Sequence, residues 1–399
     1  MINQIRNRIT RWHRDARLPE AGKAEAERDR RGLGPDPGPA ASIEASLSWL
    51  GRAQDCSASQ DGGFARHWSW IGGWAPSYPE TTGYIVPTLL DQARRRGDDH
   101  LRERARRALD WLVSIQMPDG AFPGGVVGQQ PVAPTTFNTG QILLGLAAGT
   151  REFGAAYEDA MHRAARWLVT VQDPDGAWSR YTSPFALPGA KAYDAHISWG
   201  LAEAARVSGE KSYQEAVRRN MEWTVRQQRP NGWFERCCLT DFSRPLTHTI
   251  GYVLRGLREG YELLHEDWIR QAALRGAEAL LGCLREDGFL PGRLDRNWRP
   301  CVNWACLTGA VQIAAVWLLL APDAPRAADF REAARRANAF VRRTVRIEGP
   351  PEIAGGVKGS WPVDGDYGRF QLLNWAAKFA VDAWQMELDL GDSTAESHA

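Results

Sequence analysis

Pro174-Asp175-Gly176-Ala177-Trp178 is the stretch of sequence that decides the fold, because altered copies of it recur along the chain. The step from Gly62 to Gly120 is 58 residues, and each of the next three steps, to Gly176, Gly232 and Gly288, is 56. A sixth copy, Gly355-Gly356-Val357-Lys358-Gly359-Ser360-Trp361, follows after a step longer by about a dozen residues. Similarity at a fixed period of this length is the signature of a repeat architecture.

Each period contains two helical segments of different character. Ahead of the turn, apolar residues recur at helical spacing with Arg and Glu on the opposite face, and Trp111, Trp167 and Trp223 are again 56 residues apart. After the turn comes a loop of variable length and then a helix rich in Gly, Ala and Leu with few charges. The charged face predicts an outer helix that meets water, and the uncharged segment predicts an inner helix packed on nearly all sides.

Six such pairs predict an all-α fold, the (α/α)6 toroid, made of six helix-hairpin repeats of about 56–58 residues. Closure into a ring buries both terminal faces, which an open solenoid would have to cap. An open superhelix is the alternative. The expected organisation is a leading charged helix and linker over residues 1–40, the toroid over 41–390, and a disordered tail over 391–399.

The composition is that of a folded protein without a strong charge bias. Hydrophobic residues make up 43% of the 399 residues, and Lys+Arg 49 against Asp+Glu 48 leaves a formal charge of +1. This balance gives no electrostatic case for nucleic acid. The arginine-rich segment at residues 6–17 is open to two interpretations, a peripheral contact with a membrane or partner and a frayed, solvated helix.

Six cysteines without a C-x-x-C pair, and no apolar segment of signal-peptide type at the N-terminus, predict a cytoplasmic protein with reduced thiols. The longest apolar run, 310–321, is too short to cross a bilayer and predicts a buried core helix. No nucleotide-binding or zinc-protease motif occurs, and the spacing of Cys301, Cys306 and His248 matches no zinc ligand set. We therefore expect neither a cofactor nor a metal.

The polar residues at the starts of the inner helices, with the loops before them, are expected to converge on one mouth of the ring, where helix N-termini favour anionic groups. Aromatic rings beside amides, carboxylates and guanidinium groups suit a sugar. The candidate catalytic residues are His196, His248, Glu80, Asp194, Tyr193 and Tyr367. The candidate substrate-binding residues are Trp74, Tyr78, Asn138, Gln141, Trp199, Tyr252, Asn303, Trp304, Arg293, Lys358, Asp366, Arg369, Asn374 and Lys378. For Asp and Thr at helix starts, N-capping is the competing interpretation, and Trp178 and Phe122 are expected to be packing residues.

The turns resemble those of the terpenoid-cyclase and protein-prenyltransferase superfamily. Its Q-x-x-x-G-x-W repeat is matched by Gln172–Gly176–Trp178, and with Phe as the aromatic by Gln116–Gly120–Phe122 and Gln228–Gly232–Phe234. The resemblance implies the same toroid. The Asp-x-Asp-Asp motif of class II cyclases is absent, and Asp364-Gly365-Asp366-Tyr367 only partly matches it. The Asp, Cys and His zinc ligands of the prenyltransferases are not found either.

The C-terminal stretch looks like a second group. Gly355 to Tyr367, followed by Asn374-Trp375-Ala376-Ala377-Lys378-Phe379, is similar to uncharacterised toroid proteins of bacterial surface-polysaccharide biosynthesis clusters. That resemblance implies a polysaccharide or glycolipid context. The same toroid also serves unsaturated-uronyl hydrolases, polysaccharide lyases and uronyl epimerases, which is an analogy of fold.

Three hypotheses follow, of which the first is favoured. The first is a carbohydrate-active enzyme, a lyase, epimerase or hydrolase, acting on a uronate-containing glycan or its precursor in the central cavity. For proton abstraction, His196 or His248 is expected to act as the base, Arg369, Lys378 or Asn374 to hold the carboxylate, and Tyr193 or Tyr367 to return a proton. For hydrolysis, Glu80 and Asp194 are the expected acid and base. The second hypothesis is an isoprenoid enzyme, which needs an apolar, aromatic cavity with a lone acid such as Asp366. The third is a non-catalytic glycan-binding or scaffold ring.

Overall fold

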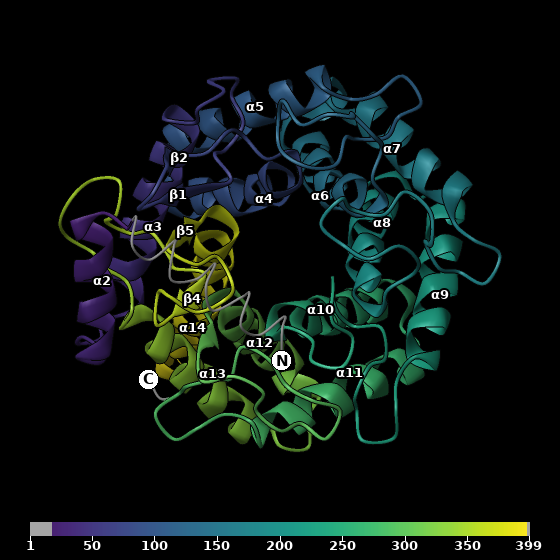
Figure 1. Cartoon of the computed structure of the whole chain (residues 1–399). Helices are drawn as coiled ribbons and strands as arrows, with labels where there is room; N and C mark the ends of the chain where they lie inside the picture. Colours follow the sequence, from purple (N-terminus) through teal and green to yellow (C-terminus); the bar gives the residue numbers. More distant parts are fainter. Residues whose placement is uncertain (1–17, 397–399) are drawn as a thin grey trace, which may run out of the picture.

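The computed structural model describes residues 18–396, and these form a closed ring of two concentric layers of helices (Figure 1). The predicted (α/α)6 toroid is confirmed. The outer helices are α3 (Pro39–Asp55), α5 (Asp99–Ser114), α7 (Glu158–Val171), α9 (Lys211–Arg226), α11 (Asp267–Leu281) and α13 (Ala327–Arg342). The inner helices are α4 (Pro79–Arg96), α6 (Thr136–Phe153), α8 (Ala195–Ser208), α10 (Thr247–Leu264), α12 (Leu307–Leu320) and α14 (Asn374–Glu396). The short 3-10 helices are η1 (Gly154–Ala156), η2 (Ala192–Asp194) and η3 (Ala321–Asp323).

The repeated turn is a clamp between consecutive repeats. Gly176 has φ +92°, and a Cβ there would lie 2.2 Å from the backbone oxygen of Arg219 on the next outer helix. Gln172 Nε2 donates to the oxygens of both Gly176 and Ala216, at 3.0 and 2.9 Å. The turn therefore needs glycine for its backbone conformation and for close approach, and it needs glutamine to fasten it to the next repeat.

The aromatic residue of each turn fills the space between two helices. Trp178 and Phe122 are fully buried, and the Trp178 indole N–H donates to the oxygen of Leu168 at 3.0 Å. The packing role predicted for both residues is confirmed. The predicted core helix at 310–321 is also found, as α12, which is buried over nearly its whole length.

The inner helices approach one another through small residues. A Cβ on Gly145 of α6 would lie 2.4 Å from the oxygen of Gly83 on α4, and one on Gly200 of α8 would lie 2.1 Å from the oxygen of Gly140 on α6. At these glycines the backbones are too close for a side chain to lie between neighbouring inner helices. Polar residues at the helix starts therefore have to lie in the turns or face the centre of the ring.

The first and last repeats close the ring. Helix α14 packs against both α4 and α3, and a Cβ on Gly355 of the sixth turn would lie 1.9 Å from the oxygen of Ala45 on α3. Strand β1 (His67–Ser69) pairs with β2 (Gly73–Trp74) and, antiparallel, with β5 (Gln371–Leu373) just before α14. A second small sheet joins β3 (Ala305–Cys306) to β4 (Ser360–Trp361). These strands lie in loops and leave the all-α architecture unchanged.

The segment before the ring differs from its prediction. The predicted leading helix falls on residues 1–17, outside the described part, whereas residues expected to form a linker contain helix α2 (Glu20–Arg30), docked on the outside of the ring (Figure 1). Lys358 Nζ holds α2 in place through Glu25 and Asp29, at 2.5 and 2.6 Å. At the other end, α14 continues to Glu396, so the tail predicted to be disordered is helical over 391–396. No helix within residues 18–396 is long and apolar enough to span a membrane.

Candidate functional site

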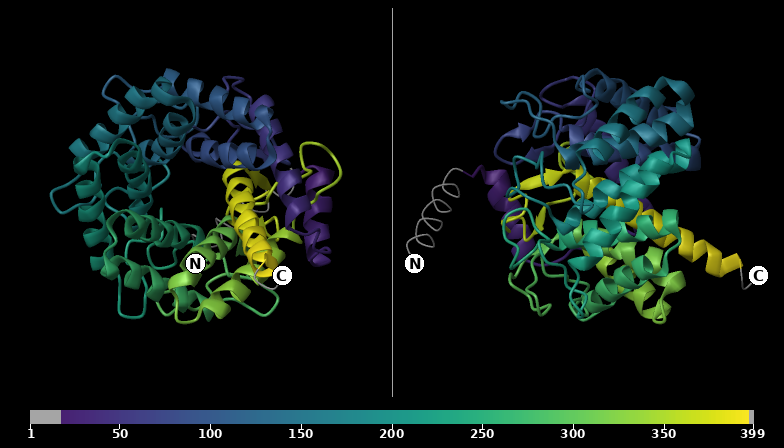
Figure 2. Two further views of the ribbon diagram at one scale, coloured as in Figure 1. Left: turned by 180° about the vertical axis from the view of Figure 1, so that it is seen from behind. Right: turned by 90° about the vertical axis from the view of Figure 1, so that its right-hand side faces the viewer.

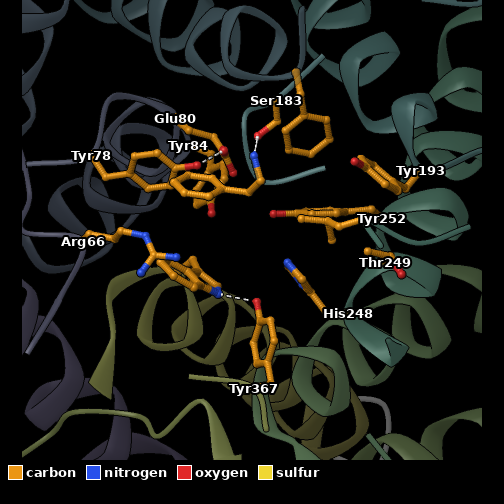
Figure 3. Close-up of a pocket in the computed structure, with 14 residues that line it drawn as sticks. Arg66, Tyr78, Glu80, Tyr84, Ser183, Tyr193, His248, Thr249, Tyr252 and Tyr367 are labelled. Atoms are coloured by element: carbon orange, nitrogen blue, oxygen red, sulfur yellow. Dashed lines mark hydrogen bonds between the residues drawn. The ribbon is translucent and has the colours of Figure 1, made fainter. Parts of the chain in front are cut away.

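A pocket of about 110 Å³ lies at the mouth of the ring formed by the starts of the inner helices (Figure 3). The side view shows the loops that lead into the inner helices gathered on one face, with α14 leaving at the opposite one (Figure 2, right). The residues that line the pocket come from several repeats. They are Arg66, Tyr78, Glu80, Tyr84, Phe137, Ser183, Phe185, Tyr193, Leu239, His248, Thr249, Tyr252, Tyr367 and Trp375. The structure thus brings together Glu80, His248, Tyr193, Tyr367, Tyr78 and Tyr252 of the predicted set.

Glu80 provides a carboxyl group on the first turn of α4. The Tyr78 hydroxyl donates to Glu80 Oε2 at 2.5 Å. Burial raises the pKa of Glu80 to about 7, although the hydrogen bond from Tyr78 and the charge of Arg66 lower it. A carboxyl group with this pKa is protonated in a large fraction of molecules near neutral pH, so it can donate a proton there.

Arg66 presents a guanidinium group to the same pocket. Its Cζ lies 5.1 to 5.6 Å from the ring centres of Tyr78, Phe185 and Trp375. The only hydrogen bond that its side chain makes within residues 18–396 joins Nη1 to His67 Nδ1 at 3.3 Å, and its Nε is buried without a hydrogen-bond partner. Burial and the neighbouring Arg66 charge lower the pKa of His67 to about 4, so His67 is neutral, and below pH 7 the Glu80 carboxyl group is largely protonated and leaves the Arg66 charge uncompensated. The guanidinium is therefore available to an anion entering the pocket.

His248 faces Glu80 from the other side of the pocket (Figure 3). Its Nδ1 lies 2.8 Å from Gln312 Oε1, an acceptor, so Nδ1 carries the proton and Nε2 keeps its lone pair. Burial lowers the pKa of His248 to about 4, although the bond to Gln312 raises it. The ring lies against Tyr252 and Tyr367, with centroids 4.4 and 5.5 Å away. His248 is thus a neutral imidazole held in place with a proton-accepting nitrogen.

The tyrosines complete the wall between these groups. Tyr84 and Tyr252 point their hydroxyls toward each other across the pocket (Figure 3), and the Tyr367 hydroxyl accepts a hydrogen bond from Trp375 Nε1 at 2.8 Å. Burial raises the pKa of Tyr84, Tyr252 and Tyr367 well above the ordinary value, so these hydroxyls stay protonated. They can donate hydrogen bonds to an oxygen-rich ligand.

His196 is not a pocket residue, although it was predicted to share the site with His248. It is fully buried, with Nδ1 2.6 Å from Gln141 Oε1 and its ring 4.2 Å from that of Tyr252. Burial lowers its pKa well below the ordinary value. Gln141 is used in positioning His196, so neither residue reaches the pocket in this structure.

Three further candidates act on the protein's own backbone or core. Asn138 donates to the Pro123 oxygen at 3.0 Å, and Asn374 donates to the oxygen of Ala65 at 2.9 Å. Asp194 is buried and accepts from the backbone N–H of Lys191 at 3.0 Å, which is an ordinary capping arrangement. Burial raises the pKa of Asp194 to about 7, against the opposing charge of Lys191. Asp194 does not line the pocket.

The remaining candidates lie elsewhere. Lys358 is buried under α2, Arg369 borders a surface groove with Asp364, and Asp366 and Asn303 are exposed. Trp304 is buried beside Leu246, Arg293 donates to the Arg244 oxygen at 2.6 Å, and the Trp74 ring lies against that of Trp49, tilted by 40°. Lys378 and Trp199 line a separate cavity at the opposite end of the ring, together with Arg255 and Asp382. Of His196, His248 and Arg369, only His248 therefore lines the pocket at the mouth.

Four important lining residues were not predicted. Tyr84 follows Glu80 by four positions on α4, so helical spacing alone places it on the same face. Phe137 and Trp375 adjoin the predicted Asn138 and Asn374 and could have been found as their neighbours. Arg66 lies four residues after Gly62, as Arg180 and Arg236 lie four residues after Gly176 and Gly232, so the repeat itself marks an arginine at this position. Within residues 18–396, no group of three or more His, Cys, Asp or Glu side chains is arranged to hold a metal ion.

Sequence comparison links part of the chain to terpenoid cyclases. The family model of the squalene-hopene cyclase C-terminal domain matches residues 80–257, less than half of the chain. A probable squalene–hopene cyclase of Sinorhizobium fredii is 31% identical over 124 residues, which cover 29% of this chain and 18% of the cyclase. The match therefore spans about a fifth of the length of that relative. The predicted resemblance of the turns to the terpenoid-cyclase group is confirmed.

Structural comparison finds whole-chain similarity to enzymes that act on sugars. An unsaturated glucuronyl hydrolase specific for heparin superposes with a TM-score of 0.70 at 15% identity, over 88% of this chain and 97% of that one. Cellobiose 2-epimerase from Bacillus thermoamylovorans gives a TM-score of 0.66 at 9% identity, over 86% and 96%. At this level of identity the similarity establishes the fold.

Proposed function

We propose that the chain is an enzyme acting on an acidic sugar, a uronate-containing glycan or glycan precursor, in the pocket at the mouth of the ring. The observation that carries the proposal is the combination of Glu80 and His248 on facing walls with the uncompensated Arg66 between aromatic rings. Acid–base residues with separated pKa values are the usual mark of paired catalytic roles.

Glu80 is the proton donor and His248 the proton acceptor in this proposal. Between pH 4 and pH 7 the carboxyl group with a pKa of about 7 is largely protonated, and the imidazole with a pKa of about 4 is largely neutral. Lysis, epimerisation and hydrolysis each need one group that accepts a proton, from carbon or from water, and one that donates a proton, to an oxygen or to carbon. The same pair serves all three reactions.

Arg66 takes the role that the sequence assigned to Arg369, Lys378 or Asn374. A planar guanidinium binds a carboxylate through two parallel hydrogen bonds. When a proton is removed from the carbon next to that carboxylate, negative charge develops on the carboxylate oxygens, and a fixed cation stabilises it. Arg66 thus supports both binding of the acidic group and the proton-transfer step.

Hydrolysis by two carboxylates is less well supported than these proton-transfer reactions. Among the described residues that line the pocket, Glu80 is the one acidic side chain, whereas the two-carboxylate mechanism needs a second about 5 to 10 Å away. Asp194, its predicted partner, is held by the Lys191 backbone outside the pocket. Hydrolysis here therefore uses His248 as the base that activates water.

The test compares uronate-containing oligosaccharides with neutral oligosaccharides of the same length. Turnover would be followed by ultraviolet absorbance for lysis, by NMR for epimerisation and by reducing ends for hydrolysis. Glu80→Gln and His248→Gln should each abolish turnover while binding is retained, and Arg66→Ala should abolish the preference for the acidic sugar. Arg369→Ala is the matched control and should behave as the wild type. Equal binding of acidic and neutral sugars by the wild-type protein would overturn the proposal.

An isoprenoid enzyme is the second candidate, and the match to the cyclase domain favours it specifically. Eight of the fourteen lining residues are aromatic and one is a carboxylic acid, a set that can protonate an alkene and stabilise a carbocation. The Arg66 guanidinium opposes a cation in the same space. Incubation with squalene and with geranylgeranyl diphosphate, followed by mass spectrometry of the extracted hydrocarbons, decides the matter. A cyclised product lost in Glu80→Gln would replace the first proposal by this one.

A further inference from the structure

Four exposed apolar side chains, here called the rim, are carried by the loops beside the pocket mouth: Val132, Tyr181, Phe185 and Leu187. Their exposed fractions are between 39% and 55%, and they are four of the seven large hydrophobic residues exposed in the described chain. Single exposed hydrophobic residues need no explanation, whereas a group at a pocket entrance does.

The two loops that carry the rim lie side by side. The Thr136 N–H donates to the Tyr181 oxygen at 3.0 Å, and a Cβ on Gly124 would lie 3.1 Å from Pro184 Cδ. Further along, the Leu187 N–H donates to the oxygen of the pocket residue Leu239 at 2.8 Å. Phe185 belongs to both places, because it is exposed on the rim and also lines the pocket. The rim is therefore continuous with the pocket wall.

These loops are also free of charge. Residues 123–135 and 181–190 contain no Asp, Glu, Lys or Arg, in a chain of which 24% is charged. Within these two segments an acidic polysaccharide would find no cation to pair with, although Arg66 and Arg180 adjoin them. An apolar chain would bury the rim without desolvating a charged group.

The size of the pocket decides what reaches the rim. The pocket is small, at about 110 Å³, so whatever is attached to a sugar ring bound in it has to leave through the mouth and across these loops. We propose, building on the proposed function, that the substrate is an acidic sugar joined to a long apolar chain, with the sugar in the pocket and the chain on the rim.

Calorimetric titration with methyl, octyl and dodecyl β-glucuronide, kept below their micelle concentrations, tests this proposal. Each methylene buried adds about fourfold in affinity, so burial of two or three makes the octyl compound bind at least about tenfold more tightly than the methyl compound. Val132→Ser/Leu187→Ser should lose most of this gain. Ile347→Ser, which removes an exposed hydrophobic residue elsewhere, is the control and should keep it. Circular dichroism verifies that the variants are folded.

Different comparisons test the rim and the pocket. Preference for octyl glucuronide over octyl glucoside, and its loss in Arg66→Ala, concerns the acidic sugar and hence the proposed function. The gain from methyl to octyl concerns the rim alone. Equal affinity for both chain lengths, or a gain unchanged in the rim variant, overturns the inference.

Two other occupants of the rim give distinct results. If a second copy of the chain covers it, sedimentation will show a dimer that the rim variant converts to a monomer. If a bilayer covers it, phosphatidylcholine vesicles will bind the wild type but not the rim variant, with no gain from chain length. Either result assigns the rim to another partner and overturns the inference.

Discussion

Glu80 and His248 face each other across the pocket with pKa values displaced in opposite directions from normal, to about 7 for the carboxyl and about 4 for the imidazole. Burial is the main cause of both displacements. Because the charged form is disfavoured in each case, the pair rests as a neutral acid beside a neutral base. Each of these shifts has a measurable consequence.

The pH dependence of kcat/KM should be bell-shaped with limbs near pH 4 and pH 7. Activity rises as His248 loses its proton through about 4 and falls as Glu80 loses its proton through about 7. Steady-state kinetics between pH 3 and pH 9 measures both limbs. His100→Gln, at an exposed position, should leave them unchanged. An activity that increases through pH 7 would make Glu80 the base and contradict the assignment.

Tyr78→Phe should move the alkaline limb to higher pH. The Tyr78 hydroxyl stabilises ionised Glu80, so its removal raises the pKa of Glu80 further, by about one unit for a charge-assisted hydrogen bond. The acid limb, set by His248, should stay in place. A loss of activity without a shift of either limb would show that Tyr78 acts on the substrate instead.

Glu80→Gln should stabilise the protein at high pH while removing activity. The pKa of Glu80 is higher in the folded than in the unfolded state, so stability falls as the pH rises from about 4.5 to about 7 and is then constant. The substitution removes this loss and should raise the free energy of unfolding by about 1–3 kcal/mol at pH 8, with little change at pH 4. Urea denaturation at both pH values measures the difference. A variant less stable than wild type at pH 8 would mean that the carboxylate is not destabilised by burial.

Gly176→Ala should cost about 3 kcal/mol of stability. The new Cβ would meet the Arg219 oxygen at 2.2 Å, and the backbone has φ +92°. Gly209→Ala is the matched control, because Gly209 has φ +72° but no atom within 4 Å of the added Cβ, so it should cost about 1 kcal/mol. Urea denaturation compares the two variants. Equal losses would show that the close approach between repeats contributes nothing beyond backbone strain.

Lys358→Ala should release α2 and destabilise the protein by about 3–5 kcal/mol. The substitution leaves buried Asp29 without a cation and buried Glu25 with only Arg346, whose Nη1 lies 3.5 Å from Glu25 Oε2. In this variant the rate of amide hydrogen exchange should increase more in α2 than in the helices of the ring. Lys23→Ala removes only an exposed pair with Glu20 and should change stability by less than about 0.5 kcal/mol. An unchanged rate of hydrogen exchange in α2 would contradict the role of Lys358 in holding this helix on the ring.

The sequence predicted the ring because its determinants are local. A glycine with positive φ and a glutamine four residues before it, as in Gln172 and Gly176, recur at a constant period, so the repeat can be recognised in the sequence. The start of α4 was also predictable, and it places Tyr78 and Glu80 at the mouth.

The distance of a side chain from the mouth, measured along its inner helix, was harder to predict. Lys378 follows Asn374 by only one helical turn, about 6 Å, yet that turn moves it from the mouth to the far cavity. Lys358 was misplaced for another reason, since its partners Glu25 and Asp29 lie more than 300 residues away in sequence. Arg66 was missed although the repeat places an arginine there, because the sequence does not show which of Arg66, Arg180 and Arg236 reaches the pocket. Such positions depend on tertiary contacts, which a single sequence does not reveal.

The joining of α3 to α14 and of β1 to β5 has a consequence for how the protein loses its structure. In a linear array, a terminal repeat can fray while the others stay folded. Here Glu80 and Arg66 come from the start of the chain, His248 from its middle and Tyr367 from its end, and all of them meet only when the ring is shut. Opening at any junction would therefore dismantle the pocket, so the molecule should unfold as one cooperative unit and lose activity in the same transition.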